Sequence, residues 1–124
     1  MVTLSECIES VEFVTLWSKN LEASRAFYID RLGLSILSER AGEFFQFVIS
    51  GLPICVDYHA ERSGNETNQI GIRVNDLEAT VDLLERSGFE VKRGGRQKPA
   101  ERWASIKDPD GHELIFLGDA VNRA

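Results

Sequence analysis

The sequence is poor in cysteine and has no long hydrophobic run. Its 124 residues include two cysteines, Cys7 and Cys55, which lie far apart and form no CxxC pattern, so neither a zinc motif nor a disulfide framework is predicted. The longest uninterrupted apolar runs, at 26–29 and 114–117, have four residues, whereas a membrane-spanning helix needs roughly 20. The first ten residues contain no basic residue and no apolar core, so we expect no secretory signal. These features predict a reduced, cytoplasmic protein without a membrane partner.

An excess of positive charge is also lacking. The chain has 14 Lys and Arg against 20 Asp and Glu, a formal charge of −6, which disfavours nucleic acid as a partner. Its length and composition predict one globular domain over residues 1–124. One local basic cluster, formed by Lys92, Arg93, Arg96 and Lys98, fits either a solvated loop or a mobile lid that binds an anion.

An internal repeat organises the chain. A shift of 56 positions places residues 13–24 over residues 69–80, with Leu-Glu-Ala identical in both copies. The repeat predicts two structural modules, at about 8–59 and 69–118, and residues 60–68 form a polar linker between them.

Each module is expected to contain one helix and four strands. Alternating polar and apolar residues at 14–18 and 70–74 predict half-buried strands. Asn20 and Asp76 have the side chains of helix N-caps, and Gly33 and Gly88 follow the helices as C-cap glycines do. The further strands are expected at 34–37, 43–49, 54–58, 89–92, 103–107 and 112–117, which gives the order βαβββ twice.

The sequence pattern leaves the strand register or the exposure of several residues open. Asp108-Pro109-Asp110-Gly111 has the composition of a tight turn, and His112 beside it is expected to cap the turn or to face solvent. Phe44, Phe45 and Phe47 are expected in the core, although a one-residue slip would reverse the face of each side chain. The register of Trp103 is open for the same reason.

The motifs at 21–28, 32–34 and 108–114 resemble the vicinal oxygen chelate superfamily, which includes glyoxalase I, extradiol dioxygenases, fosfomycin-resistance enzymes and bleomycin-resistance proteins. The resemblance extends over residues 11–117. It implies an α+β fold in which two tandem βαβββ modules form a curved mixed-sheet cleft. It also implies a homodimer, with the modules paired within one chain or exchanged between chains.

The resemblance further implies a divalent metal held by His and Glu side chains, and in this sequence those positions fall on Phe13, Cys55, Gln69 and Ile115. Phenylalanine and isoleucine cannot bind a metal, glutamine is a poor ligand, and one cysteine does not make a site. A displaced site on Cys55, Asp57 and His59 is disfavoured, because alternate positions are about 6.5–7 Å apart along a strand. We therefore expect no metal and no cofactor, and metal-dependent glyoxalase or dioxygenase activity is disfavoured.

Strand parity predicts a ligand-binding face that is both polar and aromatic. Its candidate residues by parity are Phe13, Thr15, Trp17, Cys55, Asp57, His59, Gln69 and Arg73, and the resemblance adds Ile115. The first hypothesis is metal-independent binding of a planar or cationic small organic molecule, as the bleomycin-resistance branch implies. The second is a glyoxalase-like lyase or isomerase, or a dioxygenase-type enzyme, with a divergent site in which Asp57 or His59 is a general base and Arg73 stabilises an anion. The third is a vestigial cleft in a domain that only dimerises; no catalytic residue is assigned.

Overall fold

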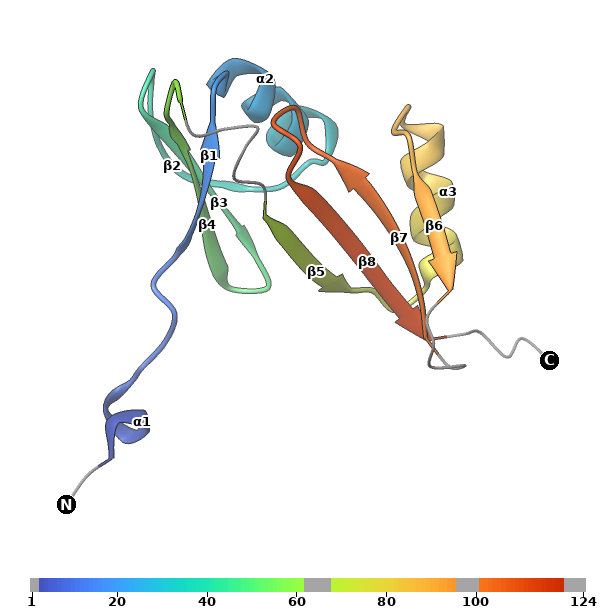
Figure 1. The fold of residues 1–124 in the computed structure, drawn as a ribbon, viewed down its shortest axis with the longest axis horizontal. Helices are drawn as coiled ribbons and strands as arrows, with labels where there is room; N and C mark the ends of the chain where they lie inside the picture. Colours follow the sequence, from blue (N-terminus) through green and yellow to red (C-terminus); the bar gives the residue numbers. More distant parts are fainter. Residues whose placement is uncertain (1–2, 62–67, 96–100, 120–124) are drawn as a thin grey trace. The chain divides into compact units, whose positions relative to one another are not determined.

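The computed structural model describes residues 3–61, 68–95 and 101–119. The chain divides into two compact units, Met1–Glu61 and Arg62–Ala124, which are called module one and module two below. Each contains a four-stranded mixed sheet (Figure 1), which confirms the predicted α+β fold class. No helix within the described ranges is long and apolar enough to cross a bilayer.

In module one the main helical segment lies between the first and second strands along the chain. Its elements are α1 (Leu4–Cys7), β1 (Val14–Ser18), α2 (Leu21–Arg25), the π-helical turn η1 (Ala26–Arg31), β2 (Ile36–Arg40), β3 (Phe44–Ile49) and β4 (Leu52–Tyr58). The strand order is β1-β4-β3-β2. β1 is parallel to β4, and the other neighbouring strands are antiparallel.

The helical segment formed by α2 and η1 begins and ends where the sequence predicts. The Asn20 side chain accepts a hydrogen bond from the N–H of Ala23 at 3.1 Å, as an N-cap does. At the other end the N–H of Leu32 donates to the carbonyl of Phe27, the wider spacing of a π-turn. Gly33 then adopts a φ of 74°, which glycine tolerates best.

The core of module one is largely aromatic. Phe27, Tyr28, Phe45 and Phe47 are buried, and Tyr28 stacks on Phe47 with ring centroids 4.7 Å apart. Phe44 is only half-buried and lies opposite Asp57 in the sheet register. The prediction of a core position was therefore correct for Phe45 and Phe47 and wrong for Phe44, because adjacent residues of a strand face opposite sides.

Module two repeats the arrangement with a regular helix. Its elements are β5 (Gln69–Arg73), α3 (Leu77–Arg86), β6 (Lys92–Gly95), β7 (Glu101–Lys107) and β8 (Glu113–Asp119). The strand order is β5-β8-β7-β6, with β5 parallel to β8. Asp76 caps α3 by accepting from the N–H of Ala79 at 3.0 Å, and Gly88 has a φ of 87°. α3 contacts β7 and β8, and the buried side chains here are mainly aliphatic: Leu77, Val81, Leu84, Ile106 and Leu114.

The predicted turn before β8 is present, but its histidine is not exposed. The carboxylate of Asp108 accepts from the N–H groups of Asp110 and His112, at 2.9 and 2.8 Å, and Gly111 has a φ of 88°. His112 is 1% exposed, and its Nδ1 accepts from the N–H of Asn68 at 3.0 Å. The expectation that His112 caps the turn or faces solvent was wrong: its side chain holds the backbone before β5.

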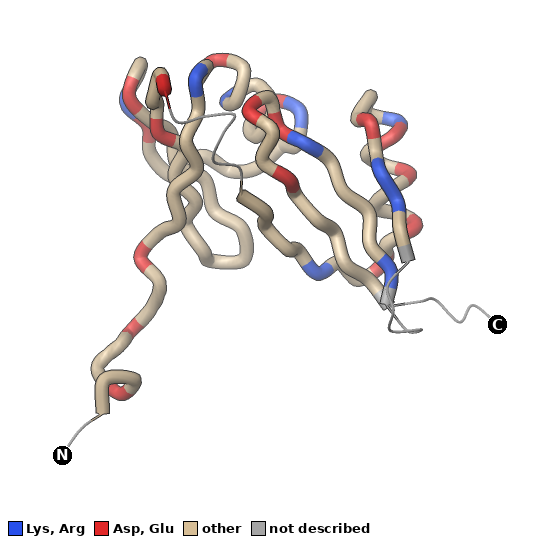
Figure 2. The backbone as a smooth tube through the Cα atoms, in the orientation of Figure 1, with Lys and Arg blue, Asp and Glu red and all other residues tan. Residues whose placement is uncertain are grey.

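Two strands begin at least two residues later than predicted, and one of them contains part of the basic cluster. β2 begins at Ile36 rather than Leu34, and β6 begins at Lys92 rather than Phe89. β6 extends to Gly95, so Arg93 as well as Lys92 belongs to a strand. Arg93 pairs with Glu78 of α3, and Figure 2 shows basic β6 and acidic positions on α3. Arg96 and Lys98, and linker residues 62–67, lie outside the described residues.

Candidate functional site

In module one the sheet face opposite the buried core carries most of the predicted residues. The parallel register places Thr15 opposite Cys55 and Trp17 opposite Asp57, and all four are half-buried. Phe13 precedes β1 and is 53% exposed. β1 and β4 are adjacent strands, so these side chains form one continuous surface on the sheet.

Cys55 and Asp57 lie closer together than strand spacing alone suggested. The Cys55 thiol donates a hydrogen bond to Oδ1 of Asp57, with Sγ and Oδ1 3.0 Å apart. Burial, together with the neighbouring Asp57 carboxylate, raises the pKa of Cys55 to about 12. Cys55 is therefore a neutral hydrogen-bond donor at physiological pH, and neither a ready thiolate ligand nor a nucleophile.

Trp17 and His59 form the second contact on this face. Their rings meet edge to face with centroids 5.5 Å apart, and Nδ1 of His59 accepts from the N–H of Glu61 at 3.2 Å. Although Asp57 and His59 are both described, no hydrogen bond joins them. The geometry thus brings two candidate bases onto one face without the base-and-orienter pair that general-base catalysis commonly uses.

In module two the corresponding sheet face forms a cavity of about 350 Å³, which is within the size range of small-molecule sites. All four strands contribute to its lining, which consists of Gln69, Gly71, Lys92, Trp103, Glu113, Ile115 and Leu117. Two of the predicted residues, Gln69 and Ile115, are among them. Arg73 lies opposite Leu117 in the register and does not line this cavity.

A cross-strand contact places the indole of Trp103 in this cavity. Trp103 is the register partner of Gly94, and a Cβ atom at Gly94 would overlap the indole ring. A glycine at this position therefore allows the ring to lie directly on the backbone of β6. On the other side of the cavity Nε2 of Gln69 donates to Oε1 of Glu113 at 2.8 Å, which fixes the carboxylate on the sheet.

Apart from Gly71, which has no side chain, sequence reasoning missed four of the lining residues, for two different reasons. Glu113 and Leu117 have the same parity as Ile115 in β8, so the alternation itself contained that signal. Lys92 and Trp103 enter the site only through the pairing of β6 with β7. That pairing depends on turn lengths that local patterns leave open.

The donor atoms at the family's metal positions do not suit a divalent ion. In module one these positions hold Phe13, which has no donor atom, and Cys55, whose pKa is raised. In module two they hold Ile115, which has no donor atom, and Gln69, whose amide is hydrogen-bonded to Glu113. No group of three or more potential metal-binding side chains occurs among the residues that the structure describes. These residues do not fit the superfamily's metal centre.

Paired βαβββ modules with mixed sheets are the fold of the glyoxalase and bleomycin-resistance group. A family model described as the Glyoxalase/Bleomycin resistance protein/Dioxygenase superfamily matches residues 10–116, and the chain belongs to this superfamily. No protein of curated function matches it.

Several solved structures share the fold at low identity. A lactoylglutathione lyase from Agrobacterium tumefaciens superposes with a TM-score of 0.75 at 16% identity, over 90% of this chain and 94% of that one. A glyoxalase/dioxygenase from Nostoc punctiforme gives 0.74 at 19% identity, over 98% of each chain. An integron cassette protein from the mobile metagenome of a Halifax Harbour sewage outfall gives 0.74 at 24% identity, over 90% and 99%. At these identities the comparisons show the shared fold, and the chemistry must be argued from the residues of the site.

Proposed function

We propose that the protein binds a small organic molecule without a metal, and that the cavity of module two is the main binding site. The observation that carries the proposal is this cavity of about 350 Å³, in which two of the family's metal positions are held by Gln69 and Ile115. Ile115 places an apolar side chain where the family has a metal ligand. The amide of Gln69 positions the Glu113 carboxylate instead of an ion.

The lining favours a planar molecule that bears a positively charged or N–H donor group. Trp103 offers an aromatic surface, and Ile115 and Leu117 continue it with aliphatic side chains; offset stacking on an indole contributes about 0.5–1.5 kcal/mol beyond the area buried. Glu113 is half-buried and held by Gln69, whereas Lys92 is exposed. The preorganised carboxylate therefore has more to offer a ligand than the solvated ammonium group.

The experiment uses three compounds that share one ring system: naphthylmethylammonium, naphthoate and methylnaphthalene. Affinities are measured by isothermal titration calorimetry, on protein treated with EDTA and on protein supplied with zinc, nickel, manganese or iron. We expect the ammonium compound to bind best, with the same affinity under all these conditions. Trp103→Ala should weaken it at least about fivefold, because the stacking surface is lost.

Gly94→Ala supplies a second variant that leaves every lining side chain chemically intact. The added methyl group overlaps the Trp103 ring, so the ring must tilt and the affinity should fall with it. Leu83→Ala, at an exposed position of α3, is the matched control and should leave affinity unchanged. Binding that requires a metal, or that is indifferent to both Trp103→Ala and Gly94→Ala, would contradict the proposal.

A Trp17→Phe variant tests the polar face of module one separately. Unchanged affinity in Trp17→Phe would assign the measured binding to module two alone. A loss of binding in this variant would show that the face of module one with Asp57 and His59 also binds the compounds. Turnover of a bound compound that is lost in Asp57→Asn would favour the divergent enzyme over a binding protein.

A further inference from the structure

Module one contains a second cavity, of about 420 Å³, between α2 and the β2–β3 hairpin. Its lining residues are Leu21, Glu22, Arg25, Glu39, Arg40, Ala41, Gly42, Phe44 and Phe45. None of them belongs to the metal positions of the superfamily or to the cavity of module two. The volume is sufficient for a small organic molecule.

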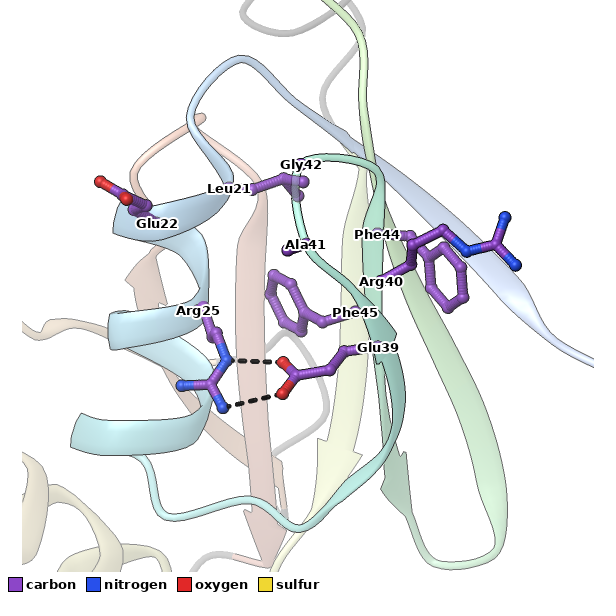
Figure 3. Close-up of a pocket in the computed structure, with 9 residues that line it drawn as sticks. All are labelled: Leu21, Glu22, Arg25, Glu39, Arg40, Ala41, Gly42, Phe44 and Phe45. Carbon is purple, nitrogen blue, oxygen red and sulfur yellow. Dashed lines mark hydrogen bonds and ion pairs between the residues drawn. The ribbon is translucent and has the colours of Figure 1, made fainter.

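The close-up shows apolar side chains on one side of this cavity and an ion pair on another. Leu21, Ala41 and the ring of Phe45 lie between the helix and the hairpin, whereas the side chains of Glu22 and Arg40 point away (Figure 3). Phe45 is 2% exposed, so its ring is held by the core beneath. A ligand that enters here meets mainly the side chains of Leu21 and Ala41, with the buried ring of Phe45 beneath them.

The ion pair is bidentate and neutral as a unit. Nε of Arg25 donates to Oε2 of Glu39 at 2.8 Å, and Nη2 donates to Oε1 at 3.3 Å. Each partner favours the charged form of the other: the hydrogen bond raises the pKa of Arg25 and lowers the pKa of Glu39. The two charges therefore compensate each other near neutral pH.

This neutrality restricts the chemistry of a ligand. A charged ligand would lose hydration against the apolar side of the cavity, and the Arg25–Glu39 pair offers it no net charge in return. Glu22 and Arg40 also line the cavity, but their side chains point away from it. An arginine has five N–H donors in all, and two of those of Arg25 are used by Glu39. The donors that remain can serve a neutral acceptor such as a carbonyl oxygen.

We propose that the cavity of module one is a second binding site, and that it takes a neutral, mainly apolar molecule with a carbonyl-type acceptor. The apolar part packs against Leu21 and Ala41 above the buried ring of Phe45, and the acceptor takes a hydrogen bond from Arg25. The site is independent of the function proposed for module two, because no residue is shared between the two cavities.

The test compares three probes that share a phenylethyl skeleton: benzylacetone, hydrocinnamate and phenylpropylammonium. Amide proton–nitrogen correlation spectra of the full chain follow each titration up to the solubility limit of the probe. We expect benzylacetone to shift the Ala41 and Gly42 amides and the Arg25 Nε–H signal. It should bind at least about fivefold more tightly than either charged probe.

Two variants and one control identify the site. Arg25→Lys keeps the charge but loses the planar donor set, and should weaken benzylacetone about fivefold, the effect of one hydrogen bond. Ala41→Phe fills the cavity and should abolish the shifts. Arg86→Lys, in the exposed pair with Asp82 on α3, should change nothing.

Other results would overturn the proposal. They are equal binding of the three probes, an absence of shifts at Ala41 and Gly42, shifts confined to module two, and full affinity in Arg25→Lys. Because circular dichroism of each variant is recorded alongside, a variant that fails to fold is recognised, and the preference among the three probes on the unmodified chain still decides.

Discussion

The two modules share one order of elements but fill it with different side chains. Module one packs four aromatic residues beneath its sheet and closes its helix with a π-turn. Module two packs mainly aliphatic residues beneath a regular ten-residue helix. The repeat therefore fixes the framework of strands and caps, while the volume under each sheet is filled independently.

The open faces of the two sheets differ even more. Module one presents the neutral thiol of Cys55, which is hydrogen-bonded to Asp57, and the Trp17–His59 ring contact. Module two presents a cavity that depends on the contact between Gly94 and Trp103. One repeated order of elements thus supports two surfaces with different chemistry, as expected where function resides in sites placed on a common fold.

The largest expected effect comes from truncation of the cores. Phe47→Ala should lower the free energy of unfolding by about 3–5 kcal/mol and Leu114→Ala by about 2–5 kcal/mol, because each removes buried surface and leaves a void. Urea denaturation measures both losses, and single-tryptophan variants containing only Trp17 or only Trp103 report on each module. Exposed Leu83→Ala is the control and should stay within about 0.5 kcal/mol.

This experiment also tests whether the modules are energetically separate. If they unfold together, either core substitution moves the transitions seen by both tryptophans. If they unfold independently, Phe47→Ala moves only the Trp17 transition and Leu114→Ala only the Trp103 transition. A loss below about 1 kcal/mol for Phe47→Ala would contradict the importance given to its aromatic cluster.

Features governed by neighbouring residues were predictable from the sequence. The caps at Asn20 and Asp76 and the turn at 108–111 depend on contacts within a few positions, and each is present. The βαβββ order followed from the repeat. The starts of β2 and β6 were misplaced because strand ends are set by the partner strand.

Features governed by distant residues were not predictable. The burial of His112 depends on a hydrogen bond from Asn68, 44 positions away. The cavity of module two requires Trp103 to lie over Gly94, which only the pairing of β6 with β7 establishes. For the same reason the cavity of module one, between a helix and a hairpin, had no counterpart in the sequence-based prediction.

The next effect concerns the thiol that only module one places on its open face. The pKa of Cys55 is raised from 9.0 to about 12, so its thiolate fraction near neutral pH is at least about a hundredfold below that of an ordinary cysteine. In a Cys7→Ser background, iodoacetamide alkylation followed by mass spectrometry should be slow and should keep rising with pH beyond 9.0. Asp57→Asn removes the negative charge and leaves only a neutral amide oxygen as acceptor, so it should speed the reaction.

The same shift predicts an alkaline loss of stability. A raised pKa means that the folded state favours the protonated thiol, so this contribution is complete below about 9 and is lost as the pH rises towards about 12. Cys55→Ala should lose less stability over this interval than the unmodified chain. An alkylation rate that levels off near pH 9, or identical alkaline titrations of the two proteins, would contradict the environment described for Cys55.

The smallest effect concerns the ion pairs that join each helix to the strand after it. In module one the helix carries the cation and the strand the anion, as Arg25 and Glu39, whereas in module two Glu78 is on the helix and Arg93 on the strand. All four side chains are partly exposed to water, so double-mutant cycles with alanine should give couplings that are a small fraction of the loss expected for Phe47→Ala and that shrink with added salt. Because an exposed pair gains little from either orientation, reversing the charges of one pair should leave the urea midpoint nearly unchanged. A large, salt-insensitive coupling in one module only would instead mean that the reversal reflects a local constraint, and in module one that constraint would be the neutrality of the cavity beside Arg25.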